Sequence, residues 1–214
     1  MPIFFQQDID ATTKLAIWKI GEGEDFFLRQ VPLQRTITHP HKRLQHLAGR
    51  YLLKQLFPAF PIDLIRVADT RKPFLEDEAY HFSISHCGDF AGVIASPARR
   101  VGIDIELQSE KIWRIRHKFI SGEEEQKLAA TLPVSHPTTN RVLFPTILWS
   151  CKEAVFKWYG LGGMDFRKHM QLRSITRLDE NDYRSVLLFS KTVPMLLDLQ
   201  TRVFGRLCMS YVFT

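Results

Sequence analysis

Residues 101–106 read Val101-Gly102-Ile103-Asp104-Ile105-Glu106, so apolar residues alternate with glycine and two acids. A period of two is typical of a β-strand, in which successive side chains point to opposite faces. Asp104 and Glu106 therefore lie side by side on one face, roughly 6–7 Å apart along the strand. Such a pair repels itself unless a cation lies between the carboxylates, which predicts half of a metal site. An edge strand whose acidic face meets water is the alternative interpretation.

The composition is that of an ordinary globular protein. The chain has 214 residues, of which 45% are hydrophobic and 24% charged, enough for one domain or two small ones. No apolar run approaches the roughly 18 residues of a membrane helix, and the N-terminus lacks the basic flank of a secretory signal, so we expect no membrane partner. Three scattered cysteines without disulfide or zinc-ligand spacing favour a reducing, cytoplasmic setting. The net charge of +6 favours an anionic partner.

Residues 1–98 predict a first half made of short strands around one helix. The helix is expected to begin with Thr38 as N-cap and Pro40 in its first turn, and to end before Pro58. Its apolar face comprises Leu44, Leu47, Ala48, Tyr51, Leu52 and Leu56, and a basic stripe on another face comprises Arg43, His46, Arg50 and Lys54. Strands are predicted at residues 16–20, 26–28, 62–67, 80–85 and 90–95, the last two as a hairpin.

Residues 99–214 form the predicted second half, after a break at residues 96–100. Ser121 and Glu124 make a capping-box pattern that opens a helix. The other expected elements are a Pro- and Thr-rich loop at 133–139, a helix from Thr146 to Tyr159 that stops at Gly160, and strands at 185–189 and 202–213. Hairpin-type strands with helices between them predict an α+β fold with mostly antiparallel sheets, not a parallel doubly wound sheet.

A second candidate for chemistry lies in the expected helix at residues 149–159. Ser150, Glu153 and Lys157 share one stripe of this helix, at i, i+3 and i+7. A surface Glu–Lys pair is the simple interpretation, but aromatic residues flank the stripe on nearly every side and predict a largely buried helix. A buried carboxylate needs a partner. Glu153 is therefore a candidate to join Asp104 and Glu106 around one divalent cation, and an all-oxygen site suits Mg²⁺ or Mn²⁺.

Four blocks of sequence follow one another between residues 71 and 157. They read Arg71-Lys72-Pro73-Phe74-Leu75, Phe82-Ser83-Ile84-Ser85-His86-Cys87-Gly88-Asp89, Gly102-Ile103-Asp104-Ile105-Glu106 and Trp149-Ser150-Cys151-Lys152-Glu153-Ala154-Val155-Phe156-Lys157. This order resembles the signature of the 4′-phosphopantetheinyl transferases, and the chain length is similar to their Sfp-type branch. The resemblance implies two similar α/β halves in one chain: residues 1–98 on the coenzyme A side, and residues 99–214 with the metal site and the carrier-protein docking surface.

The reaction that the resemblance implies moves the 4′-phosphopantetheine arm of coenzyme A to a serine of an apo acyl or peptidyl carrier protein and releases adenosine 3′,5′-bisphosphate. A divalent ion that bridges diphosphate oxygens suits this chemistry. Asp104 and Glu106 are expected to hold Mg²⁺, and Glu153 is either a third ligand or the base that takes the serine proton. Lys157 is expected to stabilise the diphosphate charge, whereas Lys152 has a diphosphate, structural or partner-facing role.

Coenzyme A also carries a 3′-phosphate. The resemblance places Arg50 and His86 at this phosphate with Ser85 nearby, and places Lys72 and Pro73 near the adenine. Arginine suits bidentate phosphate binding, whereas a turn histidine without a ligand is the alternative for His86. The chain departs from the family pattern in two places, because Arg71 replaces the usual glycine and Phe82-Ser83 stands where an asparagine often occurs. Three further basic residues are candidates for phosphate contacts: Arg35, Lys42 and Arg43.

A segment from Ile112 to Phe119 interleaves apolar and basic side chains. Carrier proteins are typically acidic around the modified serine, so Ile112, Trp113, Ile115 and Arg116 are the predicted docking residues. An ordinary amphipathic segment with a solvated basic face is the alternative.

Two other functions are alternatives to a transferase. A non-catalytic relative that binds coenzyme A or a carrier protein would have lost a metal ligand or lysine, and all are retained here. A basic nucleic-acid-binding module would use exposed aromatics, but the aromatics of this chain follow apolar periodic segments and no nucleic-acid motif is recognised. We therefore expect a magnesium-dependent transferase with no nucleic-acid partner, and a monomer, since one chain supplies both halves.

Overall fold

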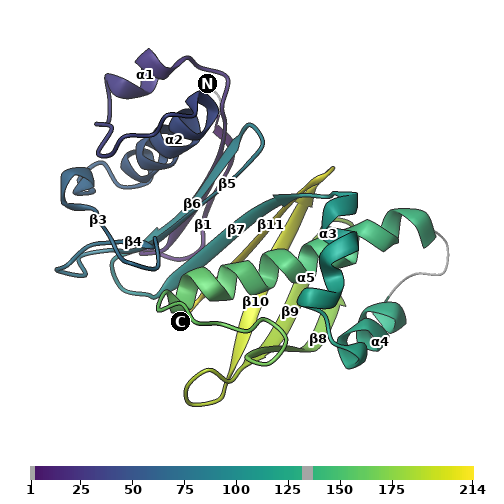
Figure 1. Cartoon of the computed structure of the whole chain (residues 1–214). Helices are drawn as coiled ribbons and strands as arrows, with labels where there is room; N and C mark the ends of the chain where they lie inside the picture. The colour runs from purple at the N-terminus through teal and green to yellow at the C-terminus, as the bar shows by residue number, and fades with distance from the viewer. Residues whose placement is uncertain (1–2, 132–136) are drawn as a thin grey trace. The chain divides into compact units, whose positions relative to one another are not determined.

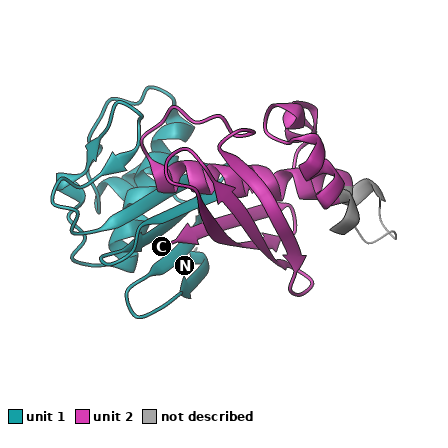
Figure 2. Ribbon diagram, turned by 90° about the horizontal axis from the view of Figure 1, so that it is seen from below, with its two compact units in different colours: residues 1–105, 214 teal, residues 106–213 magenta. Residues whose placement is uncertain are grey.

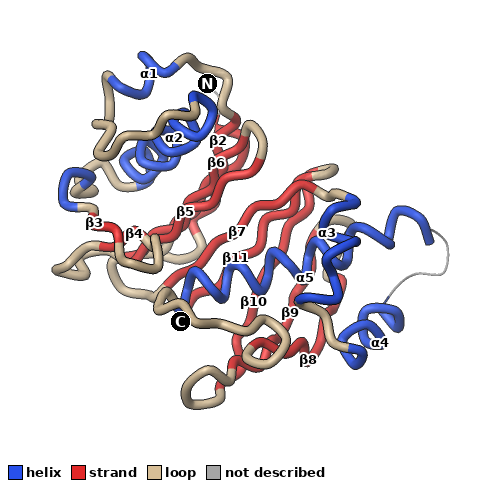
Figure 3. The backbone as a smooth tube through the Cα atoms, in the orientation of Figure 1, coloured by secondary structure: helices blue, strands red, loops and turns tan. Residues whose placement is uncertain are grey.

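The computed structural model describes residues 3–131 and 137–214, with side chains described outside 129–140. The chain divides into two compact units, residues 1–105 with Thr214 and residues 106–213 (Figure 2). The division falls inside strand β7 (Val101–Leu107). Each unit combines an antiparallel sheet with one long helix, which confirms the α+β class with two similar halves (Figures 1 and 3).

The sheet of the first unit has the strand order β1-β2-β6-β5, and every neighbouring pair is antiparallel. Its strands are β1 (Ile3–Asp8), β2 (Lys14–Lys19), β5 (His81–Cys87) and β6 (Phe90–Ser96). The predicted hairpin is confirmed, with Cys87 opposite Phe90 across a turn in which Gly88 has a positive φ of 52°. Glycine adopts this left-handed conformation without steric cost.

Helix α2 (Pro40–Leu56) packs on β6 and β2 of this sheet (Figure 1). Pro40 is its first residue, as predicted, but the N-cap is His39, not Thr38: the His39 ring nitrogen Nδ1 accepts from the Lys42 backbone N–H at 3.5 Å. The predicted apolar face is confirmed, since Leu47, Ala48, Leu52 and Leu56 are buried. The core of this unit therefore lies between α2 and the sheet.

Two predicted strands of the first unit are wrong in whole or in part. Residues 26–28 belong to helix α1 (Glu24–Leu28), whose first turn carries Glu24 and Asp25, where acidic residues favour a helix start. Residues 62–67 contain the short 3₁₀ helix η1 (Ile62–Leu64) and only a two-residue strand, β3 (Arg66–Val67), which pairs with β4 (Pro73–Phe74).

The second sheet has the strand order β7-β11-β10-β9-β8. Its further strands are β8 (Met170–Arg177), β9 (Asp182–Phe189), β10 (Met195–Phe204) and β11 (Leu207–Phe213). Strand β8 was not predicted. The strand predicted at 202–213 is two strands, because Gly205 takes a φ of 61° and turns the chain so that Phe204 faces Leu207.

Four helices accompany this sheet: α3 (Glu110–Ile115), the 3₁₀ helix η2 (Arg116–Lys118), α4 (Gly122–Thr131) and α5 (Pro137–Tyr159). The capping box of α4 is confirmed: Glu124 Oε2 accepts from the Ser121 N–H at 2.8 Å, and Ser121 Oγ accepts from the Glu124 N–H at 3.3 Å.

Helix α5 ends at Tyr159, as predicted, and Gly160 follows with a φ of 77°. Its predicted start at Thr146 is wrong, since the helix begins at Pro137 and continues through Pro145. Of the loop predicted at 133–139, residues 133–136 lie outside the described residues and 137–139 are helical. The helix packs on β11 and β10 (Figure 1). Among the described residues, no helix is both long and apolar enough to span a bilayer.

Candidate functional site

Strands β5 and β7 approach each other through serine side chains in the first unit. Ser83 and Ser85 alternate along β5, and their hydroxyls accept from the backbone N–H groups of Ile103 and Ile105, both at 3.2 Å. The Ser85 hydroxyl also donates to Asp104 Oδ1 at 2.9 Å. The structure therefore brings two of the predicted site residues, Ser85 and Asp104, into direct contact.

The glycine of β6 opposite Ser85 makes this approach possible. A Cβ at Gly92 would lie 3.0 Å from Ile105 Cγ2, closer than nearly all real contacts. The Asp104 side chain is only 3% exposed. The alternative of an acidic strand face in water is therefore wrong for Asp104, and a buried carboxylate is held in place by a serine hydroxyl.

Glu106 and the predicted residues of α5 belong to the second unit. Glu106 is half-buried, and its Oε1 accepts from the indole N–H of Trp149 at 3.1 Å. Glu153 and Lys157 are half-buried on α5, whereas Ser150 of the same stripe is fully buried. The stripe therefore lies at the margin of the core, and the roles of Glu153 and Lys157 stay predictions.

The three predicted metal ligands are carboxylates, a donor set that suits Mg²⁺. Asp104 belongs to the first unit, and Glu106 and Glu153 belong to the second. Within residues 3–131 and 137–214, no group of three or more His, Cys, Asp or Glu side chains is gathered to hold a metal ion. The magnesium site therefore stays a prediction.

A basic cluster lies at the middle of α2. We define it as Arg50 and His46 of this helix together with Arg35 of the segment before it. Arg50 is 5% exposed and His46 is 8% exposed. Arg50 Nε donates to Gln34 Oε1 at 3.2 Å, and Arg50 Nη1 lies 3.1 Å from His46 Nδ1. Gln34 in turn donates to the Ile62 carbonyl at 2.7 Å, which fixes the amide oxygen toward Arg50. The buried guanidinium is thus positioned by neutral groups.

Burial and the nearby positive charges lower the pKa values of Arg50 and His46 in this cluster. Burial, with the nearby charge of Arg35, lowers the pKa of Arg50 to about 10. Burial and the charges of Arg50, Arg35 and His86 lower the pKa of His46 to about 3, so His46 is neutral at pH 7. Positive charge buried without a carboxylate is unfavourable until an anion arrives. An open hollow of about 480 Å³ lined by Gln34 and Arg35 adjoins the cluster.

The other residues predicted for coenzyme A lie on the same unit. His86 is exposed at the end of β5. Lys72 is half-buried before Pro73, the first residue of β4, and burial together with the charge of Arg100 lowers the pKa of Lys72 to about 8. Arg71 adopts a φ of 67°, the left-handed conformation that favours glycine. Arg71 thus has a backbone conformation that a glycine would adopt without strain.

The three weaker candidates for phosphate contacts, Arg35, Lys42 and Arg43, differ in their surroundings. Arg43 forms two hydrogen bonds to Glu24, at 2.8 and 2.7 Å, and these raise the pKa of Arg43. Its charge is already balanced, so Arg43 is a poor phosphate ligand. Lys42 is exposed on α2, and Arg35 is the exposed member of the basic cluster.

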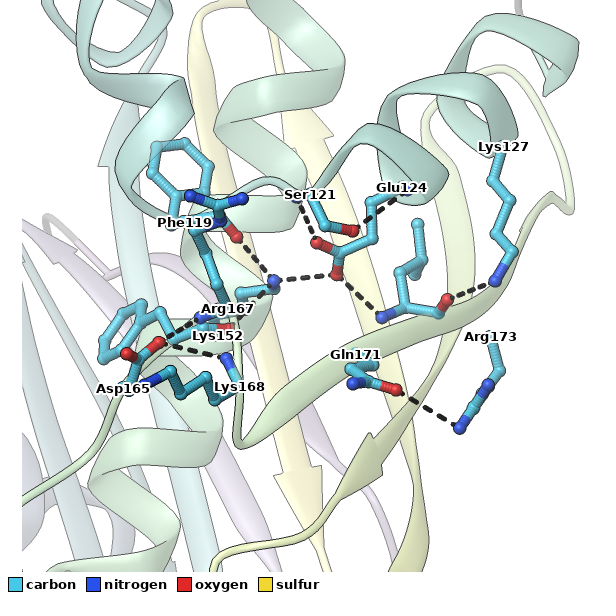
Figure 4. A network of polar contacts seen from close by, with 12 residues as sticks. Phe119, Ser121, Glu124, Lys127, Lys152, Asp165, Arg167, Lys168, Gln171 and Arg173 are labelled. Carbon is cyan, nitrogen blue, oxygen red and sulfur yellow. Dashed lines mark hydrogen bonds and ion pairs between the residues drawn. The ribbon is translucent and has the colours of Figure 1, made fainter.

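Of the diphosphate, structural and partner-facing roles considered for Lys152, its contacts support the structural one. Its side chain is 0% exposed, and its ammonium donates to the Phe119 carbonyl at 2.6 Å and the Phe166 carbonyl at 3.1 Å and pairs with Glu124 Oε1 at 2.7 Å (Figure 4). Glu124 Oε1 also accepts from the Leu172 N–H at 2.8 Å. All three donors of the ammonium are satisfied inside the second unit.

The predicted docking residues differ in how they are placed. Ile112 is 5% exposed and packs in the core of the second unit, so its assignment as a surface anchor is wrong. Trp113 is half-buried, with the guanidinium of Arg116 3.7 Å from its ring centroid and that of Arg141 at 4.9 Å. Arg116 also pairs with Glu125 at 3.2 Å, and Ile115 is half-buried against the core.

An open hollow of about 950 Å³ lies near these residues in the second unit. Its aromatic wall is formed by Phe119, Trp149 and Phe166, whose ring centroids follow one another at 4.9 and 5.5 Å. Its basic lining residues are His117, Lys118, Arg167 and Lys168. The one acid, Asp165, directs Oδ1 to the backbone N–H groups of residues 167 and 168 (Figure 4).

Three polar residues of the site were missed by the sequence analysis as site residues: His46, Gln34 and Ser83. His46 was placed on the basic stripe of α2, one turn before Arg50, and this i, i+4 spacing was the available signal. Gln34 lies in an irregular segment and carries no motif. Its contact with Arg50 depends on tertiary packing.

Comparison with known proteins gives two findings. Residues 100–202 match the family model of the 4′-phosphopantetheinyl transferase superfamily. Two proteins described as 4′-phosphopantetheinyl transferase AcpT, from Escherichia coli O157:H7 and Escherichia coli strain K12, are each 30% identical over 122 residues. These matches cover 56% of this chain, and the chain spans 59% of the length of each curated relative.

Proposed function

Because residues 100–202 match the family model of the 4′-phosphopantetheinyl transferase superfamily, we propose that this chain transfers the 4′-phosphopantetheine arm of coenzyme A to a serine of an apo carrier protein. The observation that carries the proposal is the basic cluster, in which Arg50 is buried among neutral and positive groups. A phosphate is the anion that such a cluster suits. Coenzyme A supplies both a phosphate monoester and a diphosphate.

The first unit is proposed to hold the adenosine end of coenzyme A. Arg50 and His86 bind the 3′-phosphate, and Ser85 lies nearby through its place on β5. Lys72 and Pro73 contact the adenine side, and the half-buried ammonium of Lys72 adds positive charge there. These roles follow the family resemblance residue by residue.

Asp104, Glu106 and Glu153 are proposed to hold Mg²⁺. When bound, this ion would neutralise charge on the diphosphate and orient the reacting groups. The Ser85 hydroxyl supports this assignment, because its hydrogen bond to Asp104 Oδ1 fixes the orientation of the carboxylate. Trp149 does the same for Glu106 Oε1. Held carboxylates are what a metal site requires of the residues around it.

In the proposed reaction, the carrier serine oxygen forms a bond to the phosphorus that bears the pantetheine arm. The phosphorus–oxygen bond to the adenosine side breaks, and adenosine 3′,5′-bisphosphate leaves. Glu153 takes the serine proton, directly or through water, or serves as the third metal ligand. Lys157, one turn after Glu153 on α5, donates to the diphosphate oxygens and stabilises their charge.

The carrier protein is proposed to dock on the second unit. Trp113, Ile115 and Arg116 remain candidates, and the hollow lined by His117, Lys118, Arg167 and Lys168 adds a basic rim around an aromatic wall. An acidic carrier helix suits such a surface, because opposite charges steer the encounter and buried aromatics supply grip. The protein is further proposed to act as a monomer in the cytoplasm, without a nucleic-acid or membrane partner.

The proposal is tested by incubating the protein with coenzyme A, Mg²⁺ and several apo carrier proteins, and weighing the carriers by mass spectrometry. We expect a carrier to gain the mass of one phosphopantetheine. If the protein binds coenzyme A but modifies no carrier, the non-catalytic alternative is favoured. Asp104→Asn should abolish turnover without unfolding the protein, because the hydrogen bond from Ser85 has an amide oxygen to accept it. Asp198→Asn, which changes a surface pair with Arg184 and a hydrogen bond from Gln200, is the matched control and should retain activity.

A further inference from the structure

His46 presents an unusual buried atom in the middle of α2. Its side chain is more than nine-tenths buried, and within the described part of the chain its Nε2 has no hydrogen-bond partner. Buried polar atoms in folded proteins nearly always have a partner, so an exception indicates a missing one.

The contact with Arg50 decides which ring nitrogen of His46 carries the proton. A guanidinium can only donate, and Arg50 Nη1 lies 3.1 Å from His46 Nδ1. Nδ1 must therefore accept, and the proton of the neutral ring is on Nε2. The pKa of His46, lowered to about 3 by burial and by neighbouring positive charges, keeps the ring neutral at physiological pH. His46 Nε2 is thus a donor N–H, and the missing partner is an acceptor.

The surroundings indicate what kind of acceptor is missing. Positive charges on Arg50, Arg35 and His86 all act on His46. Each hydrogen bond that Arg50 makes ends on a neutral acceptor, either Gln34 Oε1, His46 Nδ1 or the His46 carbonyl. Glu24 lines the adjoining hollow with Gln34 and Arg35, but its carboxylate is already bound by Arg43. An oxyanion fits a site that offers charged and neutral donors and in which, among the described residues, no carboxylate bonds to Arg50 or His46.

We propose that His46 determines specificity for the phosphate monoester of coenzyme A, by donating from Nε2 to a phosphate oxygen while its Nδ1 holds the Arg50 guanidinium in place. This inference rests on the proposed function, in which Arg50 binds the 3′-phosphate. A neutral donor adds a hydrogen bond to the phosphate without adding a further positive charge to those already crowded there. His46 therefore strengthens ligand binding without increasing the repulsion in the empty site.

The test compares ligand affinities by isothermal titration calorimetry on the full chain, with coenzyme A, 3′-dephospho-coenzyme A and adenosine 3′,5′-bisphosphate. Asparagine at position 46 retains an acceptor near Nδ1 and removes the Nε2 donor, whereas glutamine has an amide that reaches the Nε2 position. His46→Asn should weaken coenzyme A and the bisphosphate about 10-fold or more, the loss of one hydrogen bond to a charged group, and leave dephospho-coenzyme A unchanged. His46→Gln should stay within about threefold of the wild type, since it restores the donor.

His41→Asn is the matched control on the same helix, because His41 pairs with Asp89 at the surface. It should leave all three affinities unchanged. The inference is overturned if His46→Asn keeps the wild-type affinity for coenzyme A, or weakens coenzyme A and its dephospho form equally, which would assign His46 to the diphosphate or to the scaffold. If either of these two results is obtained while the wild type still binds coenzyme A and modifies carriers, only the role of His46 is wrong. If the wild type binds none of the three ligands, the proposed function fails and this inference fails with it.

Discussion

Among the residues whose side chains are described, each unit buries one long basic side chain, Arg50 in the first and Lys152 in the second, and the partners of the two differ. Lys152 pairs with Glu124 and gives its remaining donors to the carbonyls of Phe119 and Phe166 (Figure 4). Within the described part of the chain, the hydrogen bonds of the Arg50 side chain go to Gln34 and His46, which are neutral. Both lie on the long helix of their unit, so the difference is in the partners and not in the local structure.

We interpret this difference as the one between a residue of the scaffold, Lys152, and a residue of the proposed binding site, Arg50. A buried charge with a complete set of internal partners contributes to one fixed arrangement of the chain, and removing one member leaves the other unpaired. A buried charge without an opposite charge is a cost to the folded protein that a ligand can offset. Lys152 lies in a block that resembles the family signature, yet its geometry assigns it to the first kind.

The largest effect is expected from breaking the internal pair. Lys152→Met should lower the free energy of unfolding by about 3–5 kcal/mol, because the Glu124 carboxylate would stay buried without its partner. Urea unfolding followed by circular dichroism measures the change. The double substitution Lys152→Met with Glu124→Leu should recover much of the loss, since the unpaired charge is gone. A Lys152→Met protein as stable as the wild type would contradict the structural role.

Removing the buried charge of Arg50 should have the opposite effects, a small change in stability and a large loss of affinity for coenzyme A. Arg50→Met should change the free energy of unfolding by less than about 1 kcal/mol, because a buried positive charge is replaced by an apolar side chain of similar size. The same substitution should weaken coenzyme A binding about 100-fold, the loss of hydrogen bonds to a charged phosphate. Calorimetric titration and urea unfolding of one preparation measure both. A variant that loses stability and keeps its affinity would reverse the comparison between the two units.

A smaller effect is expected from Lys72, whose charge is only partly suppressed. Its pKa is lowered to about 8 by burial and by Arg100, so the free protein loses this charge as pH rises through that value. Coenzyme A favours the protonated form, and its affinity should fall by up to about 10-fold between pH 7 and pH 9. Titrations at several pH values test this. Lys72→Met should remove the pH dependence, and an unchanged slope in that variant would assign it to another group.

The sequence predicts those parts of the fold that depend on local chemistry. The hairpin around Gly88, the capping box of Ser121 and Glu124, and the end of α5 at Gly160 are all set by residues close in the chain, and all are confirmed. Helix α5 begins earlier than predicted because buried Phe144, Ile147 and Leu148 stabilise it around Pro145. Helix α1 was predicted as a strand because three residues carry too little periodicity to decide.

The sequence predicts the site residues that lie in motif blocks, but not the contacts that depend on tertiary packing. Ser85 and Asp104 were identified from motif blocks and Arg50 from the family resemblance, and the structure joins Ser85 to Asp104. The burial of His46 and Arg50 on the basic stripe of α2 was not visible, because a helical pattern does not say which polar side chains another segment covers. The partner of Lys152 was equally hidden, since Glu124 lies on a different helix.

The measurement that tests this comparison most directly is the shift in melting temperature that saturating coenzyme A causes in the wild type, Arg50→Met and Lys152→Met. The wild type should gain about 5 °C or more, since a ligand at 100 times its dissociation constant adds about 2.7 kcal/mol of stability. Lys152→Met should show the same gain from a lower starting temperature, and Arg50→Met should start near the wild type and gain almost nothing. A full gain in Arg50→Met would contradict the claim that its buried charge awaits the phosphate of coenzyme A.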